Sequence, residues 1–507
     1  MNPPREPSEL PPGREIEVPA RPLSSLEGLV GSARFATLQR TAARTGRALR
    51  NQTIWNVSST AAGGGVAEML RVLVGYVLDA GIDIRWEVMA GDRDFFAVTK
   101  RIHNWLHGHR GDGQPIDRRQ AAHYRDVTAV NAARLVPRIR PGDVVLLHDP
   151  QTAGLAGRLA AHGARVVWRC HVGRETANEW TERGWSFLHA HLTGCEAFVF
   201  SLPAFVPSWV DPSRVWIIPP SIDPFSPKNQ ELTPTTVRRI LARLRLLPGG
   251  DRRTPTYVRS DGAPGHLAGA ATVVSEVETP LRPSLPLVTQ VSRWDRLKDM
   301  AGVMTGFASG VVGRVDAQLA LVGPAVDGVS DDPEEQDVFQ DCVARWGSLP
   351  PSARQRIVLV TLPMDDVDEN AVMVNAIQRH SAVVVQKSLE EGFGLTVAEA
   401  MWKRKAVLAS RVGGIVPQVP PGTGLLLDDP TDLDGFGAML VDLLEQPTEI
   451  VALGRRAHRH VLDGFIGDVH LIRYAELVTA LVSGRRPLDQ KARSGPRARR
   501  PPPRHPG

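Results

Sequence analysis

The chain has 507 residues, of which 42% are hydrophobic and 23% are charged, and its formal net charge is +5. This length exceeds one ordinary domain and this composition is typical of a globular protein, so we predict two large domains. The charge is local, because residues 485–507 hold eight Lys or Arg and one Asp, which gives that segment +7 and the rest of the chain −2; this argues against nucleic-acid binding.

The remaining global features exclude further classes of protein. No apolar run approaches a membrane span, and residues 1–20 lack the apolar core of a signal peptide. We therefore expect a cytoplasmic protein without membrane insertion. Cys170, Cys195 and Cys342 are scattered and odd in number, so they form neither a disulfide framework nor a metal-ligand spacing.

Short apolar runs alternate with helical patterns along the chain. They fall into two sets, at 53–57, 144–147, 166–168, 197–200 and 215–218, and at 287–291, 319–322, 357–360, 382–385, 406–409 and 425–427. Runs that are apolar throughout indicate strands buried on both faces, as in parallel sheets, and the alternation with helices indicates βαβ units. The predicted fold class is α/β, with two Rossmann-like doubly wound domains facing across a cleft.

The same reading divides the chain into segments. We expect an extended, partly disordered N-terminal arm (1–50), an N-terminal domain (51–230), a C-terminal domain (231–465) with an irregular insertion at about 248–286, a helix packing back on the N-terminal domain (466–484) and a disordered basic tail (485–507). The last three helices are predicted at 434–444, 449–462 and 469–481.

A glycine loop follows the first predicted strand. Gly63, Gly64 and Gly65 open an amphipathic helix, where glycine lets the backbone approach a ligand and N–H groups point at an anion. The pattern matches neither a Walker A loop nor G-x-G-x-x-G. A plain tight turn is the alternative.

Polar residues also end two other strands of the first domain. Asp149 and Gln151 follow the strand at 144–147 and could hydrogen-bond a sugar, although capping of the next helix is an equal expectation for Asp149. His171 ends the strand at 166–168. A histidine there is more often a satisfied structural group, but the cleft edge makes contact with a substrate plausible.

Two cations follow the first strand of the second domain. Arg293 and Lys298 are well placed to neutralise a diphosphate leaving group as charge builds on it. For either residue alone, a solvated basic loop is the simpler interpretation, and the segment described next reverses that preference.

The most informative segment is 387–399. It places Glu391 and Glu399 around the turn Gly392-Phe393-Gly394, between an apolar strand and a helical run. Such a strand–turn–helix unit aims backbone N–H groups at an anion, while the two carboxylates can each bind a polyol. A sugar nucleotide offers hexose, diphosphate and ribose in that order. Helix capping alone remains an alternative for Glu399.

Other chemistries find no support in the sequence. Asp331, Asp332, Asp365 and Asp366 are interpreted as loop and cap residues, and no metal ligands are assigned. Nucleophile elbows, zinc signatures and Cys-x-x-Cys pairs are absent from the sequence.

Taken together, these motifs resemble family 4 of the retaining glycosyltransferases, which have the GT-B fold. Within that family, residues 55–69, 148–151, 220–229 and 365–375 are similar to the trehalose synthases that join a nucleotide-activated glucose to glucose. The resemblance covers about residues 53–481.

The resemblance implies roles for particular residues. It implies that the C-terminal domain binds the nucleotide sugar and the N-terminal domain the acceptor. The implied roles are diphosphate binding by Arg293 and Lys298, donor contacts through backbone N–H groups of Gly392, Phe393, Gly394 and Leu395, glucose binding by Glu391, ribose binding by Glu399, contact with the transferred glucose by His171, and phosphate and acceptor contacts by Gly64 and Gly65.

The implied reaction is retaining transfer of glucose from a nucleoside-diphosphate glucose to glucose, which forms α,α-trehalose without cofactor or metal. Another acceptor in the same family is the near alternative. A sugar-nucleotide epimerase, a phosphorylase or a non-catalytic sensor on this fold are more distant ones. The expected partners are the two substrates, with no nucleic acid, and a homodimer is left open.

Overall fold

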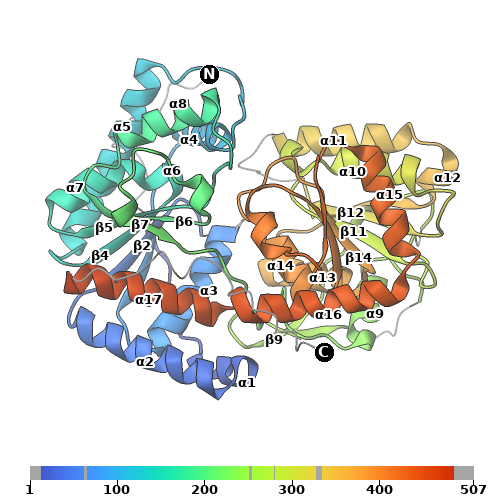
Figure 1. Cartoon of the computed structure of the whole chain (residues 1–507), viewed down its shortest axis with the longest axis horizontal. Coiled ribbons are helices and arrows are strands. Elements are labelled where there is room, and N and C mark those ends of the chain that lie inside the picture. Colours follow the sequence, from blue (N-terminus) through green and yellow to red (C-terminus); the bar gives the residue numbers. More distant parts are fainter. Residues whose placement is uncertain (1–12, 62–64, 250–253, 279, 327–333, 485–507) are drawn as a thin grey trace, which may run out of the picture.

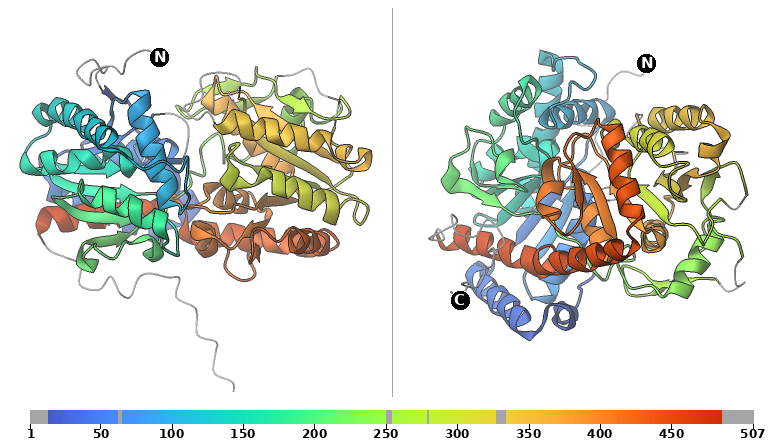
Figure 2. Two further views of the ribbon diagram at one scale, coloured as in Figure 1. Left: turned by 90° about the horizontal axis from the view of Figure 1, so that it is seen from above. Right: turned by 45° about the vertical axis from the view of Figure 1, so that its right-hand side comes forward.

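The computed structural model describes residues 13–61, 65–249, 254–278, 280–326 and 334–484. This part of the chain forms two halves side by side, each built around a seven-stranded sheet with helices on both faces (Figures 1 and 2). No helix in these ranges is long and apolar enough to cross a membrane.

The N-terminal sheet is parallel apart from an edge strand. Its strands lie in the order β1 (Arg14–Glu15), β3 (Ile84–Val88), β2 (Ile54–Ser58), β4 (Val144–His148), β5 (Arg165–Cys170), β6 (Cys195–Phe200) and β7 (Val215–Ile217). Edge strand β1 pairs antiparallel with β3. The chain leaves β2 for β3 on one side and returns to β4 on the other, and such a reversal opens a crevice at the carboxyl ends of the strands.

The C-terminal sheet repeats this plan. Its strands lie in the order β10 (Thr272–Val274), β13 (Ile357–Leu362), β12 (Gln318–Pro324), β11 (Leu287–Val291), β14 (Val383–Gln386), β15 (Ala406–Ser410) and β16 (Leu425–Leu427). Edge strand β10 is antiparallel to β13. The order reverses between β11 and β14, so the loops after these two strands share one crevice.

Helices connect the strands and cover the sheets. In the N-terminal half they are α3 (Gly65–Asp79), α4 (Arg93–Leu106), α5 (Arg118–Leu135), α6 (Asp149–Thr152), α7 (Ala156–Ala161) and α8 (Glu179–His189). In the C-terminal half they are α9 (Pro234–Arg243), α10 (Met300–Gly310), α11 (Glu334–Gly347), α12 (Pro351–Arg354), α13 (Val367–His380), α14 (Leu395–Trp402), α15 (Leu433–Leu444) and α16 (Pro447–Gly464).

Every predicted strand forms, and most of the apolar runs are buried in a sheet whose two faces are covered, while the edge strands β7 and β16 are largely half-buried. Strand β3 was not predicted. Its residues alternate between buried and exposed at Ile84, Arg85 and Trp86, so it lacks the continuous apolar run that marks its neighbours.

The last helix packs back on the N-terminal half. Helix α17 (Gly467–Ser483) lies along α2 (Ser32–Leu49) beneath that half (Figure 1). Arg34 Nη2 donates to Asp468 Oδ1 at 2.8 Å, and the hydroxyls of Thr45 and Thr479 are 2.8 Å apart.

Two other expectations are corrected. The described part of the N-terminal arm is not extended, because it includes α1 (Glu27–Val30) and the 18-residue helix α2. The insertion is not irregular throughout either, since β8 (Thr256–Val258) and β9 (Pro264–His266) form a hairpin and β10 extends the C-terminal sheet. The tail at 485–507 lies outside the described residues.

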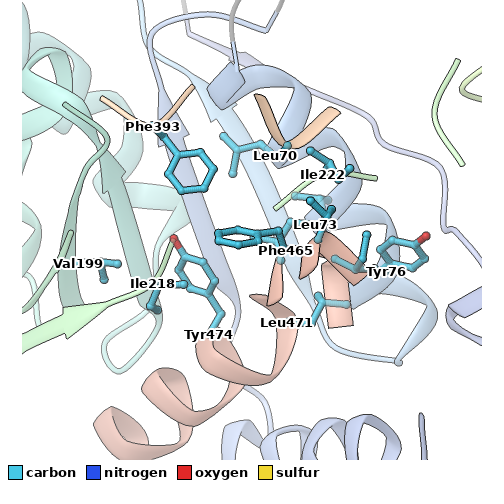
Figure 3. Close-up of a cluster of buried hydrophobic side chains, with 14 of the residues drawn as sticks. Leu70, Leu73, Tyr76, Val199, Ile218, Ile222, Phe393, Phe465, Leu471 and Tyr474 are labelled. Carbon is cyan, nitrogen blue, oxygen red and sulfur yellow. The ribbon is translucent and has the colours of Figure 1, made fainter. Parts of the chain in front are cut away.

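One apolar cluster joins the two halves. It includes Leu73 of α3 and Ile218 after β7 from the N-terminal half, Phe393 before α14 from the C-terminal half, and Phe465 between α16 and α17. Figure 3 shows Phe465 among these side chains, and its ring centroid is 5.9 Å from that of Phe393. The halves are therefore held at the point where the chain crosses between them.

This cluster generates a stability prediction. Phe465 is 7% exposed, so Phe465→Ala removes buried apolar surface and leaves a cavity, which costs about 3 kcal/mol. We expect a lower unfolding midpoint in urea, followed by circular dichroism. Val451→Ala, at a position that is 52% exposed, is the control and should leave the midpoint unchanged. Equal unfolding midpoints for both variants would show that the Phe465 side chain does not stabilise the cluster between the halves.

Candidate active site

The loops at the carboxyl ends of the two sheets are in contact. A Cβ atom at Gly392, in the loop after β14, would stand 2.9 Å from the carbonyl oxygen of His171 and 3.5 Å from Cε1 of His107. Both histidines belong to the N-terminal half, His171 after β5 and His107 at the end of α4. The glycine is therefore required by this close approach, and the loop of one half lies against the strand ends of the other.

An ion pair joins the two motifs that the sequence placed on separate loops. Lys298 lies at the end of the short 3₁₀ helix η7 (Arg296–Lys298), and its Nζ donates to Glu391 Oε2 at 2.6 Å. The hydroxyl of Ser388 donates to the same oxygen at 3.1 Å. Both side chains are mostly buried, so the cation and the carboxylate are fixed in place.

The turn after Glu391 leads into the N-terminus of α14. Gly394 has φ +80°, a left-handed conformation that glycine adopts without strain, and no side chain caps the helix. The first N–H groups of α14 are thus presented at the loop. The Phe393 ring is buried in the shared apolar cluster, so its side chain serves the packing between the halves (Figure 3).

The N-terminus of α3 lies opposite that of α14. A Cβ atom at Gly65 would be 2.8 Å from Leu395 Cδ1, so the two helix starts, one from each half, nearly touch. Two helix N-termini at one point favour an anion there. Gly64 lies outside the described residues.

Asp149 and His171 form a hydrogen-bonded pair after β4 and β5. The two carboxylate oxygens of Asp149 accept from the backbone N–H of His171 at 2.8 Å and from its Nδ1 at 3.0 Å. Asp149 holds a left-handed φ of +64°, which is strained for a residue with a side chain. Burial alone would raise the pKa of Asp149, but His171 outweighs it and lowers the pKa to about 2.

His171 is consequently a neutral imidazole with a defined orientation. Burial lowers its pKa, and Asp149 opposes this only in part. The hydrogen bond assigns the proton to Nδ1, which leaves Nε2 as an acceptor. Nε2 is buried and has no hydrogen-bond partner within the described ranges. The ring stacks on His148 at 5.4 Å, and His148 Nε2 lies 3.1 Å from Asn56 Oδ1.

Arg293 sits farther out than Lys298. Its side chain is 46% exposed and contacts Asp295 Oδ2 at 3.4 Å and Glu335 Oε1 at 3.7 Å. It is therefore at the rim of the site, while Lys298 is inside. Gln151 lies on α6, and its Oε1 is buried without a hydrogen-bond partner among the residues described.

His103 and His107 were not predicted as site residues from the sequence. Burial, followed by Lys298, lowers the pKa of His107 to about 4. Burial, followed by the neighbouring His107 and Lys100, holds the pKa of His103 well below its usual range. His107 is thus a neutral group facing the Lys298–Glu391 pair. The signal was the spacing of four residues near the end of an amphipathic helix, which places both side chains on one face.

Glu399 lies beyond the turn, beside a cavity of about 380 Å³ between the halves. Its side chain is 7% exposed, and Oε1 is 3.8 Å from Lys228 Nζ. The cavity is also lined by Glu68 and Leu395, so it continues from the facing helix starts. In the described ranges, no group of three or more His, Cys, Asp or Glu side chains is arranged to hold a metal ion.

Comparison with known proteins identifies the family. A family model described as the N-terminal domain of trehalose synthase matches residues 56–207, and one described as glycosyl transferases group 1 matches residues 310–446. The trehalose synthase of Rubrobacter xylanophilus is 32% identical over 447 residues, which cover 88% of this chain and 93% of that protein. This chain belongs to the trehalose synthase family of glycosyltransferases.

A second relative agrees with this assignment, and a solved structure shows the same fold. The trehalose synthase of Pyrococcus horikoshii is 31% identical over 92% of this chain and 98% of that protein. The structure of an α,α-trehalose-phosphate synthase (UDP-forming) from Burkholderia xenovorans, in complex with glucose-6-phosphate, has a TM-score of 0.62 at 16% identity, covering 85% of this chain and 99% of that one. The predicted GT-B fold is confirmed, and the chain is an enzyme, a glycosyltransferase.

The buried ion pair generates a kinetic prediction. Lys298→Ala should lower kcat by about 10²- to 10³-fold while the KM for the sugar acceptor changes little, as expected of a cation that acts on charge developing in the transition state. Lys405→Ala is the control, since Lys405 precedes β15 at the opposite end of the sheet. Steady-state kinetics check this, and equal losses in kcat and acceptor binding would contradict it.

The lowered pKa of His107 generates a pH prediction. An unfolded histidine titrates near 6.5 and this one near 4, so between these values the unfolded chain binds a proton that the folded chain does not. The contribution of neutral His107 to the free energy of unfolding is fully present above pH 6.5 and falls by roughly 3 kcal/mol as the pH drops to 4. His107→Gln should make this fall shallower in urea unfolding at pH 7, 5.5 and 4.

The control for the pH series is His266→Gln, because His266 is exposed on β9. It should leave the pH dependence as in the unmodified protein. An unchanged slope in His107→Gln would show that His107 does not carry the effect.

Proposed function

We propose that the enzyme transfers glucose from a nucleoside-diphosphate glucose to free glucose with retention, forming α,α-trehalose. The observation that carries the proposal is the Lys298–Glu391 pair, at 2.6 Å, beside the facing N-termini of α3 and α14. The pair provides a cation for phosphate and a carboxylate for hydroxyl groups in one place. The relatives named trehalose synthase support the choice of product.

The donor diphosphate would lie between Lys298 and the two helix N-termini. Gly65 supplies one helix start, and the loop from Gly392 to Leu395 supplies the other. N–H groups and helix dipoles favour an anion there without a metal ion. Arg293, at the rim, would add charge as the diphosphate leaves.

The glucosyl group would lie between Glu391 and His171. The carboxylate of Glu391 accepts hydrogen bonds from sugar hydroxyls, and the unpartnered Nε2 of His171 accepts another. Asp149 uses both oxygens on His171, so we propose that it orients this imidazole rather than contacting the acceptor. Gln151, whose buried Oε1 has no hydrogen-bond partner in the described part of the chain, is then the better candidate for binding the acceptor sugar.

In the proposed reaction, the bond between C1 of glucose and the β-phosphate oxygen breaks, and C1 bonds to an oxygen of the second glucose on the same face. The proton of the attacking hydroxyl passes to the leaving phosphate. The protein's part is to hold the two sugars and to stabilise the phosphate charge through Lys298, Arg293 and the helix N-termini. Water is kept from the donor by closure of the two halves.

Product analysis tests this proposal. The purified protein is incubated with ADP-, UDP- or GDP-glucose and with glucose or glucose 6-phosphate, in EDTA. We expect a non-reducing disaccharide from free glucose, with both anomeric centres α by NMR, and the three donors are ranked in the same experiment.

Two outcomes would contradict the proposal. If nucleoside diphosphate is released without this product, the enzyme still transfers the sugar but free glucose is not its acceptor. Activity that EDTA abolishes and Mg²⁺ restores would discard the metal-free mechanism.

A further inference from the structure

One lysine contacts carboxylates from both halves of the molecule. Lys228 Nζ donates to Glu68 Oε1 at 2.7 Å and to Oε2 at 2.8 Å, and it lies 3.8 Å from Glu399 Oε1. Glu68 belongs to α3 of the N-terminal half and Glu399 to α14 of the C-terminal half. All three residues line the 380 Å³ cavity.

The backbone around Lys228 is fastened to the C-terminal half. The Trp402 indole donates to the carbonyl of Asn229 at 3.1 Å, and Lys403 Nζ donates to its side-chain oxygen at 2.9 Å. Asn375 Nδ2 donates to the carbonyls of Pro227 at 3.0 Å and Gln230 at 2.9 Å. Lys228 therefore moves with α13 and α14, while Glu68 moves with α3.

We propose that Lys228 is a positioning residue for the donor nucleotide. It orients the Glu399 carboxylate at the cavity, and through Glu68 it holds the first turns of α3 against the same site. This inference rests on the proposed function, in which Glu399 binds the ribose and α3 closes on the diphosphate.

Charge balance explains why a cation is needed at this place. Glu399 is mostly buried, and a carboxylate taken out of water is stable only where an opposite charge and hydrogen bonds compensate for the lost hydration. Burial alone would lower the pKa of Lys228, but Glu399 and Glu68 outweigh it and raise the pKa, so the lysine stays charged. The geometry adds a second role. The backbone around Lys228 is held by the C-terminal half and its Nζ donates to Glu68 of the N-terminal half, so the lysine ties the two halves together beside the cavity.

A purely structural ion pair would behave differently. It would contribute to the unfolding midpoint and leave nucleotide affinity unchanged. The two interpretations are therefore separated by measuring nucleotide affinity and stability on the same variants.

The test is isothermal titration calorimetry of the full chain with ADP, UDP and GDP. We expect Lys228→Met to raise the Kd of the nucleoside diphosphate that the unmodified protein binds best by about tenfold, and Lys228→Arg to restore most of the loss. Glu68→Gln should weaken binding in the same direction, and the double variant should lose less than the sum of the two. With saturating donor, kcat should change by less than threefold.

The matched control is Arg356→Met. Arg356 makes an ion pair with Asp316 at 2.8 Å and is 25% exposed, close to the 20% of Lys228, but it precedes β13 at the far end of the sheet. If Lys228→Met does not fold, Glu68→Gln, at a side chain 42% exposed, carries the test.

The outcomes separate the two claims. If the unmodified protein binds no nucleoside diphosphate, the proposed function fails and this inference fails with it. If it binds one, and the folded Lys228 and Glu68 variants bind it within twofold of the same Kd, only the role of Lys228 is overturned. A loss that Arg356→Met reproduces would overturn it as well.

Discussion

The site depends on the fixed arrangement of two parallel sheets whose carboxyl ends face each other. Neither half holds the complete set of groups, since Lys298 and Glu391 come from one and His107 and His171 from the other. The contact is close enough that position 392 has no room for a Cβ atom. The apolar cluster around Phe465 supplies this arrangement, because it includes side chains of both halves beside the crossing point. A shift of one half would therefore separate Lys298 and Glu391 from His107 and His171.

Within that frame, the charges are divided by role. Cations and helix N-termini gather where we place the diphosphate, and neutral imidazoles face the place of the sugar. The division is physical, because burial and the field of Lys298 hold His107 neutral, and Asp149 fixes the tautomer of His171. A second lysine, Lys228, pairs with the carboxylates of Glu68 and Glu399 at the cavity between the halves.

The sequence predicted the parts of this structure that depend on local patterns. Continuous apolar runs marked the parallel strands, and the loops after them were singled out with Arg293, Lys298 and Glu391. Strand β3 was not predicted, because buried and exposed residues alternate in it. Helix α2 was not predicted, because its partner, α17, lies more than 400 residues later in the sequence.

Contacts between residues that are far apart in the sequence were not predicted either. Lys228 and Glu68 are 160 positions apart, and no local pattern indicates that they meet. Asp149 was predicted to contact a sugar or cap a helix, whereas the structure places both of its oxygens on His171. Only the path of the strands brings these two residues together.

The central claim is that one nucleotide sugar bridges the two halves, and a crystal structure with bound nucleoside diphosphate and glucose tests it most directly. The account predicts diphosphate oxygens about 3 Å from Lys298 Nζ and from the first N–H groups of α14, with the ribose on Glu399 and the sugar beside His171. A nucleotide bound elsewhere, with Lys298 still paired only to Glu391, would contradict it.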